Sequence, residues 1–255
     1  MRVTPKRLSG LLGNDRSLTV LLCSIMAGVF VVRPLESIGY ETRIASSVVF
    51  TLILVSGMAA VAHSRAAVLL FAVAIVSGAL HWARYTVFGA EWTSVDAVAT
   101  FVSCGTLGTL VLIQVLREGP ITPQRIQGAI AAYLLIALTC AAAYTWIDVH
   151  EPNAFSGSAT AVASTRDPIQ RFAYFSFITL TTVGYGDVVP QAAFARSLAI
   201  FEALIGQLFP SILLARLVSM ELYYRQRRFE REQAALDREA LAREVARQLR
   251  EGAAP

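Results

Sequence analysis

Charged residues are scarce in this chain, and long stretches contain none. Asp, Glu, Lys and Arg make up 16% of the 255 residues, whereas 55% are hydrophobic and the mean hydropathy is +0.56. Soluble domains carry about 25% charged residues, so the composition favours a membrane protein. The net charge of +4 comes from arginines in loops and tails. This distribution indicates an orientation signal rather than a nucleic-acid-binding face.

Cysteine is rare too, with three residues in the chain. Cys23, Cys104 and Cys140 are odd in number, widely spaced and placed inside apolar runs, which argues against a disulfide framework or a metal site. We expect all three to be buried thiols that act as small hydrophobic side chains.

Enzyme motifs are missing. The chain has no H-E-x-x-H, G-x-S-x-G or P-loop lysine motif, so we expect a protein that is not an enzyme, with no cofactor and no evident small-molecule ligand. No G-x-G-x-x-G follows Val218, which argues against an attached nucleotide-binding regulatory domain. We find no repeated halves of the kind that secondary transporters show.

Long apolar segments dominate what is present. A membrane-spanning helix needs about 20 apolar residues, and Phe172–Leu180 has about half that length, which is typical of a re-entrant segment. We predict an all-α membrane protein with six transmembrane helices, a re-entrant helix and loop, and a cytoplasmic C-terminal helix. The six predicted spans are Ser17–Val32, Ile44–Ala62, Ala66–Ala83, Ala97–Leu116, Ile126–Ile147 and Ser197–Ala215.

Basic residues set the predicted orientation. A cluster precedes the first span, and Arg33 and Pro34 follow that span where a signal peptide would have a small-residue cleavage site. We therefore expect a retained helix and a multi-pass protein of the cell membrane with both termini cytoplasmic. The Ala- and Arg-rich composition suggests a bacterial inner membrane. The basic cluster is Arg2, Lys6, Arg7 and Arg16.

Four parts follow from this layout. We predict a cytoplasmic N-terminal segment (residues 1–16), a four-helix transmembrane domain without a charged sensor (17–119), a pore domain (120–218) and a cytoplasmic polar helix (219–255).

The stretch "FSFITLTTVGYGDVVP" (175–190) places glycines and a tyrosine directly after the half-length segment. Irregular backbone at membrane depth is tolerated only where it lines water or is buried in protein. Gly184 and Gly186 can take left-handed dihedral angles. Their alternation with Val183 and Tyr185 can turn successive carbonyl groups to the same side, and a row of such oxygens can replace the water around a cation.

The heptapeptide "TTVGYGD" (181–187) resembles the selectivity-filter signature of potassium channels, and the helices expected around it resemble that family's pore, over about residues 126–218. The resemblance implies that K⁺ is the transported ion and that four copies of the chain surround it, because each chain supplies one strip. It implies ion sites formed by the backbone oxygens of the filter pentapeptide and the Thr182 hydroxyl. The pentapeptide is Thr182, Val183, Gly184, Tyr185 and Gly186.

The same resemblance assigns roles to the flanks. Thr181 supports the filter, and Asp187 lies at its outer mouth. Tyr174 and Phe175 are candidates to brace Tyr185, with plain core packing as the alternative.

Two positions bear on selectivity and inactivation. Some prokaryotic relatives carry a glutamate where this chain has Ile178, which puts acid-pair control of filter inactivation in doubt. Tyr185 favours potassium selectivity.

The alternatives are a poorly selective cation channel and a non-conducting regulatory subunit. The predicted partners are other copies of the chain and membrane lipid, and not nucleic acid.

The last span should line the inner cavity. Gly206 is either a hinge or a site of close helix packing, and Pro210 should kink the helix. Leu214 and Val218 form either an apolar constriction near the cytoplasmic end or lipid and subunit contacts. Glu202 is an intramembrane acid, which favours a functional role. It faces either the re-entrant helix, accepting a hydrogen bond from Thr179, or the cavity.

The helices before the pore lack a voltage-sensor pattern. A sensor needs several basic residues on the fourth helix, and this segment has none before Arg117. We expect weak or no voltage dependence. His63, His81 and Arg84 lie at span ends, where interface anchoring is the expected role, with proton sensing by His81 as the alternative.

The tail after Val218 is rich in Arg, Glu and Ala. It is predicted to be one polar helix with i,i+4 ion pairs at Glu221–Arg225 and Glu239–Arg243. Its apolar seam is irregular, so a solvated helix and a loose oligomer bundle both remain open.

Overall fold

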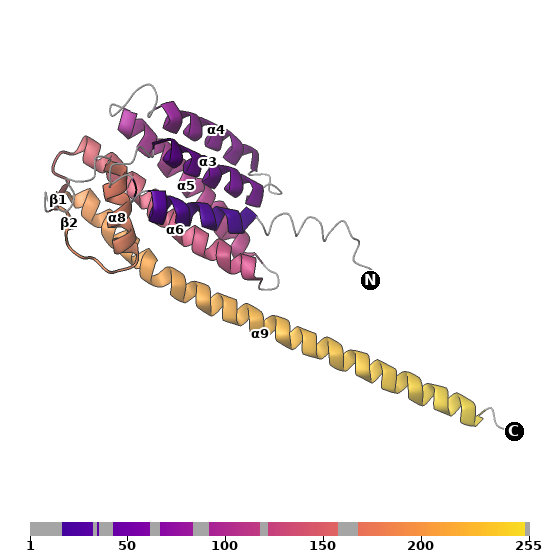
Figure 1. Ribbon diagram of the computed structural model, residues 1–255. Helices are drawn as coiled ribbons and strands as arrows, with labels where there is room; N and C mark the ends of the chain where they lie inside the picture. Colours follow the sequence, from indigo (N-terminus) through magenta and orange to yellow (C-terminus); the bar gives the residue numbers. More distant parts are fainter. Residues whose placement is uncertain are drawn as a thin grey trace. The chain divides into compact units, whose positions relative to one another are not determined.

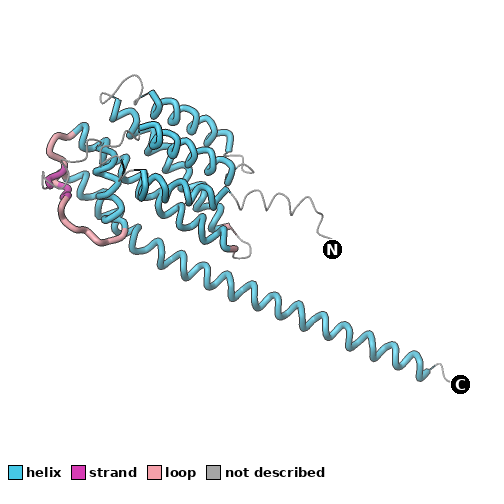
Figure 2. Tube along the Cα trace, in the orientation of Figure 1, coloured by secondary structure: helices cyan, strands magenta, loops and turns pink. Residues whose placement is uncertain are grey.

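The structure is a computed structural model that describes residues 17–32, 35, 43–61, 67–83, 92–117, 122–157 and 168–252. The predictions for residues 1–16, His63 and Arg84 lie outside these residues. Almost everything described is helical (Figure 2). The elements are η1 (Gly28–Val32), α3 (Arg43–Val61), α4 (Ala67–Ala83), α5 (Thr93–Leu116), α6 (Pro123–His150), β1 (Phe155–Gly157), α8 (Pro168–Leu180), β2 (Val188–Pro190) and α9 (Ala193–Gly252).

Helix length supports a membrane protein of all-α class. Three helices are long and apolar enough to cross a membrane, namely α5, α6 and residues Ala193–Arg243 of α9. Ser17–Val32, Ala45–Ala60 and Ala72–Ala83 are shorter apolar helices. The count of six spans and the re-entrant course of α8 therefore stay predictions.

Two compact units make up the chain. One contains residues 1–117 and 122–211, and the other contains 118–121 and 212–255. In the first unit, α3, α4, α5 and α6 lie side by side (Figure 1), and α8 packs against α6. The predicted boundaries at 119/120 and 218/219 stay predictions.

Small residues bring α5 and α6 close together. A Cβ on Gly108 would lie 3.3 Å from Leu135 Cβ, and one on Gly128 would lie 2.9 Å from Val115 Cγ2. Without strong hydrophobic driving force in lipid, such close backbone approach is what lets helices associate. α6 begins with Pro123 in its first turn, where the missing amide hydrogen costs nothing.

The cysteines divide between interior and surface. Cys104 and Cys140 are buried as predicted, whereas Cys23 is exposed, so the prediction was wrong for that thiol. An apolar run predicts a membrane segment but does not say which face of that segment meets other helices.

An aromatic cluster fixes α8 against α6. The Phe172 and Phe155 rings lie 4.6 Å apart, and the Tyr144 and Phe175 rings meet edge to face at 5.0 Å. All four side chains are buried in one apolar core. Edge-to-face aromatic pairs stabilise a core beyond their buried area, so this cluster sets the position of α8.

A short sheet closes the loop beside this core. β1 pairs with β2 in antiparallel register, with Ser156 opposite Val189. A Cβ on Gly157 would overlap the Asp187 carbonyl oxygen, so only glycine permits this approach. These strands were not predicted from the sequence, and they hold the chain after residue 187 beside the end of α6.

α9 is one uninterrupted helix from Ala193 to Gly252, with Pro210 inside it. The inner span and the polar tail are therefore continuous. The two predicted ion pairs are confirmed, at 3.2 Å for Arg225 and Glu221 and 3.5 Å for Arg243 and Glu239. Apolar tail side chains such as Phe229 and Leu236 are exposed, which leaves both interpretations of the tail open.

Candidate functional site

The strip, residues 181–187 directly after α8, has a backbone in which the sign of φ alternates from residue to residue. Thr182, Gly184 and Gly186 have φ angles of 60°, 53° and 78°, whereas Val183 and Tyr185 between them do not have positive φ. Both glycines thus take the left-handed conformation that the sequence analysis allowed them. A positive φ at a β-branched residue such as Thr182 is strained, and strain of this kind persists where the surrounding structure enforces it, often at functional sites.

The end of α8 holds the start of the strip. The Ile178 carbonyl oxygen accepts hydrogen bonds from Val183 N at 2.9 Å and Gly184 N at 3.1 Å. The Thr181 hydroxyl donates to Phe177 O at 2.7 Å, and Tyr133 of α6 donates to Leu180 O at 3.1 Å. These bonds satisfy carbonyl groups that a helix end leaves without an intrahelical partner. The helix end carries partial negative charge, which favours a nearby cation.

Asp187 closes the strip at its other end. Tyr174 of α8 donates a hydrogen bond to the Asp187 carboxylate at 2.8 Å, and Val188 N donates to the same carboxylate at 3.0 Å. The phenol is the donor in this bond, because an ionised carboxylate can only accept.

The two predicted supports of Tyr185 lie in different places. Tyr174 reaches Asp187, as described above, while Phe175 is 4% exposed and belongs to the aromatic core. Core packing, the alternative left open for Phe175, is what its contacts support. In a single chain the Tyr185 side chain is 72% exposed and Val183 is 52% exposed, so the strip is open to solvent or to another chain.

Glu202 lies in the interior on the face of α9 that meets α6 and α8. Its side chain is fully buried. Tyr144 donates a 2.6 Å hydrogen bond to Glu202 Oε2, and the Ser176 hydroxyl contacts Oε1. The carboxyl group thus faces α8, and its partner there is Ser176 rather than Thr179. Nothing in the sequence paired Tyr144 with Glu202, but Ser176 stands out as a polar residue within an apolar run.

Gly206 lies one turn further along α9. A Cβ at this position would overlap Leu180 O and would lie 2.7 Å from Leu180 C. The contact supports the close-packing interpretation of Gly206. Pro210 lies one turn later, and Leu214 and Val218 are 65% and 50% exposed within α9. Their assignment to a gate stays a prediction.

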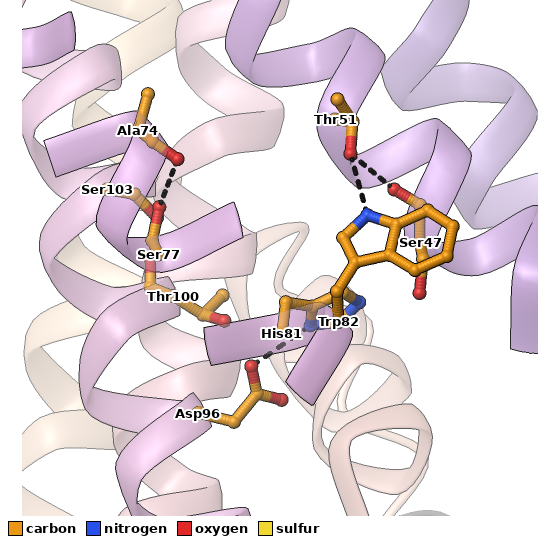
Figure 3. A network of polar contacts seen from close by, with 9 residues as sticks. All are labelled: Ser47, Thr51, Ala74, Ser77, His81, Trp82, Asp96, Thr100 and Ser103. Carbon is orange, nitrogen blue, oxygen red and sulfur yellow. Dashed lines mark hydrogen bonds and ion pairs between the residues drawn. The ribbon is translucent and has the colours of Figure 1, made fainter. Parts of the chain in front are cut away.

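A second polar cluster lies among the first helices (Figure 3). His81 of α4 and Asp96 of α5 form a 3.0 Å contact between Nδ1 and Oδ1, and both residues are buried. The Phe50 ring of α3 lies against the His81 ring at a tilt of 32°, with centroids 4.5 Å apart. The predicted interface anchoring of His81 was wrong, because its polar partner is another helix rather than the membrane surface.

Metal-ligating side chains do not cluster in the described part of the chain. No group of three or more His, Cys, Asp or Glu residues lies together there.

Residues 132–222 match an ion channel family. The matched region runs from within α6 through α8, the strip and the first half of α9. It favours transport over catalysis and supports a membrane location.

Three relatives agree with this match. "Two pore potassium channel c" from Oryza sativa subsp. japonica is 36% identical over 91 residues, which is 36% of this chain and 20% of that protein. "Protein LctB" from Bacillus caldotenax is 34% identical over 87 residues, which is 34% of this chain and 64% of that protein. "Protein LctB" from Geobacillus stearothermophilus is 29% identical over 122 residues, which is 48% of this chain and 90% of that protein.

The matches cover part of each protein. The alignments span a fifth of the rice protein and less than two thirds of the Bacillus caldotenax protein. No solved structure matches. Together the comparisons support an ion channel of the potassium-channel type for the region from α6 to α9.

Proposed function

We propose that this protein is a potassium-selective channel that conducts K⁺ passively as a homotetramer. The observation that carries the proposal is the alternating backbone, with positive φ at Thr182, Gly184 and Gly186. Alternation of this kind turns successive carbonyl groups toward one side, so that the strip presents a row of oxygens. Rows from several chains around an axis can replace the hydration shell of a cation.

The surroundings of the strip support the same role. The ion channel match includes it, and α8 directs its partly negative C-terminal end at the point where the strip begins. K⁺ is the substrate here, held by the oxygens of Thr182, Val183, Gly184 and Tyr185. Asp187, fixed by Tyr174, would then lie at the mouth that K⁺ enters.

Exposed apolar residues on α9 support assembly. Phe194, Phe201, Leu204 and Leu208 recur at helical spacing on one side of α9, away from buried Glu202, and each is more than half exposed in a single chain. Side chains of this size on a membrane helix meet other chains or lipid. A fourfold arrangement would let α9 line a cavity below the strip.

Orientation and gating complete the proposal. The basic residues before the first span support an orientation with both termini in the cytoplasm, in which the strip would face the outside of a multi-pass cell membrane protein. α5 contains no Lys or Arg, which supports a channel that is not steeply voltage-gated.

Purified protein in liposomes tests the proposal. We expect a K⁺ gradient to drive flux, with K⁺ strongly preferred over Na⁺ in mixed solutions. The Gly184→Ala variant should lose this flux, since an alanine held in the left-handed conformation costs roughly 1–2 kcal/mol in every copy. Gly78→Ala is the matched control, because both sites have open space around the new Cβ but only Gly184 has a positive φ.

Three results would count against the proposal. Equal K⁺ and Na⁺ flux would indicate a poorly selective cation channel. Absence of flux from well-folded wild-type tetramers would indicate a regulatory subunit. Unchanged selectivity in Gly184→Ala would remove the strip from the ion pathway.

A further inference from the structure

Glu202 joins three helices at one buried point. Its fully buried carboxyl group, on α9, accepts the 2.6 Å bond from Tyr144 of α6 and contacts Ser176 of α8. The Ser176 hydroxyl also lies 2.6 Å from Ala137 O of α6. A chain of polar contacts therefore runs from α9 through α8 to the backbone of α6.

The hydrogens available at these contacts favour a neutral Glu202. A serine hydroxyl has a single hydrogen to donate, yet Ser176 contacts two oxygens that both accept, Ala137 O and Glu202 Oε1. A backbone carbonyl carries no hydrogen. All contacts are satisfied when Glu202 is protonated, so that it donates to Ser176 and Ser176 donates to Ala137 O. An ionised Glu202 would leave one contact without a hydrogen between the two oxygens.

The other groups around Glu202 agree with a neutral acid. Tyr133, Cys140 and Tyr144 of α6 are the titratable side chains that face it, and α8 contributes the non-titrating Ser176. Within the described residues no Lys, Arg or His pairs with Glu202. A buried carboxylate without a cationic partner is costly, whereas a protonated acid with a donor and an acceptor is not.

The same face of α9 touches α8 a second time. One turn after Glu202, Gly206 packs directly against Leu180 O, the last carbonyl of α8, which also accepts the bond from Tyr133. The strip begins at the next residue, Thr181. α9 therefore contacts α8 at two points, through Glu202 with Ser176 and through Gly206 with Leu180 O. A displacement of α9 would move α8 at both points, and the second point adjoins the carbonyl row of the strip.

We propose that Glu202, as a neutral acid, is a positioning residue that ties α9 to α8 and so fixes the geometry of the strip from behind. The inference rests on the proposed function, because it assigns Glu202 to the support of an ion-conducting strip. It assigns no contact between Glu202 and the ion.

Two substitutions at the same position test the inference. Glu202→Leu removes the acid while keeping bulk, and we expect K⁺ flux in liposomes to fall by roughly 25-fold, since each of two lost buried hydrogen bonds contributes about a factor of five. Glu202→Gln keeps one donor and one acceptor, so it should restore most of the flux lost in Glu202→Leu. An equal loss of flux in both variants would contradict the claim that Glu202 is protonated. Full flux in Glu202→Leu would contradict its positioning role.

If Glu202→Leu does not assemble, variants that each remove one hydrogen bond to Glu202 still test the inference. Tyr144→Phe and Ser176→Ala should each reduce K⁺ flux by about fivefold in intact tetramers. Ser56→Ala is the matched control, because that buried hydroxyl hydrogen-bonds within its own helix, to Leu52 O at 2.6 Å with Ile53 O further away at 3.2 Å. Reductions no larger than in the control would overturn the proposal.

Infrared spectroscopy separates this inference from the proposed function. The wild-type spectrum should contain the carbonyl band of a protonated carboxylic acid, and Glu202→Gln should lack it. If wild-type protein carries no K⁺ flux, the proposed function fails while the band still reports the neutral acid. If flux is present and the band is absent, the proposed function stands and the assignment of Glu202 as a neutral acid is wrong.

Discussion

Replacing Gly206 with alanine tests how closely α9 meets α8. The new Cβ would overlap Leu180 O and would lie 2.7 Å from Leu180 C and 3.0 Å from its Cα, whereas ordinary contact begins at 3.4 Å. Clearing Leu180 C alone requires the helices to separate by about 0.7 Å, and clearing the nearer Leu180 O requires more. All three neighbouring atoms belong to the backbone, so no side-chain rotation relieves the overlap.

The expected cost follows from this overlap. Overpacking costs about 1–3 kcal/mol, and backbone neighbours place Gly206→Ala at the upper end. Alanine regains roughly 0.8–1 kcal/mol over glycine through helix propensity, which leaves a net loss of about 2 kcal/mol per chain. For a chain of this size the thermal midpoint should fall by roughly 4–8 °C. The K⁺ flux should fall with it, because Leu180 adjoins the strip.

Thermal unfolding of purified protein in detergent, followed by circular dichroism, measures this loss. Gly78→Ala is the control, because a Cβ there meets no heavy atom within 4 Å, and it should leave the midpoint equal or slightly raised. If Gly206 is instead a hinge that needs flexibility, Gly206→Ala should raise the midpoint while flux falls. A raised midpoint would thus refute close packing against Leu180.

Two further predictions concern the polar contacts. Tyr174→Phe removes the donor to Asp187 and should lower the unfolding free energy by about 1 kcal/mol and weaken K⁺ over Na⁺ selectivity in liposome flux; unchanged selectivity would separate this bond from the strip. His81→Leu removes the 3.0 Å contact of buried Asp96 and should lower that energy by about 3 kcal/mol. The double variant with Asp96→Leu should recover part of this loss in thermal unfolding, and a larger loss in the double variant would contradict the pairing.

Hydropathy and local spacing predicted the helices well. The apolar runs around Cys104 and Cys140 appear as α5 and α6, with ends that differ by a few residues because polar turns such as Pro123–Arg125 extend the helices beyond the apolar cores. Exposure of Cys23 was missed, since an evenly apolar run carries no sign of which face is covered. The left-handed glycines followed from the glycine spacing itself.

Contacts between segments far apart in the chain could not be predicted from the sequence. Glu202 stood out as an acid in an apolar span, but its partner Tyr144 lies 58 residues away, and only the packing of α6 on α8 and α9 brings them together. β1 and β2 pair residues 155–157 with 188–190, and strands of three residues are too short for a period-two pattern to appear.

The pairing of His81 with Asp96 adds a physical reason to expect weak voltage dependence. These are the acidic and basic side chains that the described spans of α4 and α5 contain, and they lie in contact with each other. Moving such a pair together carries little net charge through the membrane field, whereas a sensor needs several charges. α5 instead packs along α6 through Gly108 and Gly128. An influence of α4 and α5 on the pore would then pass through this packed interface rather than through charge movement.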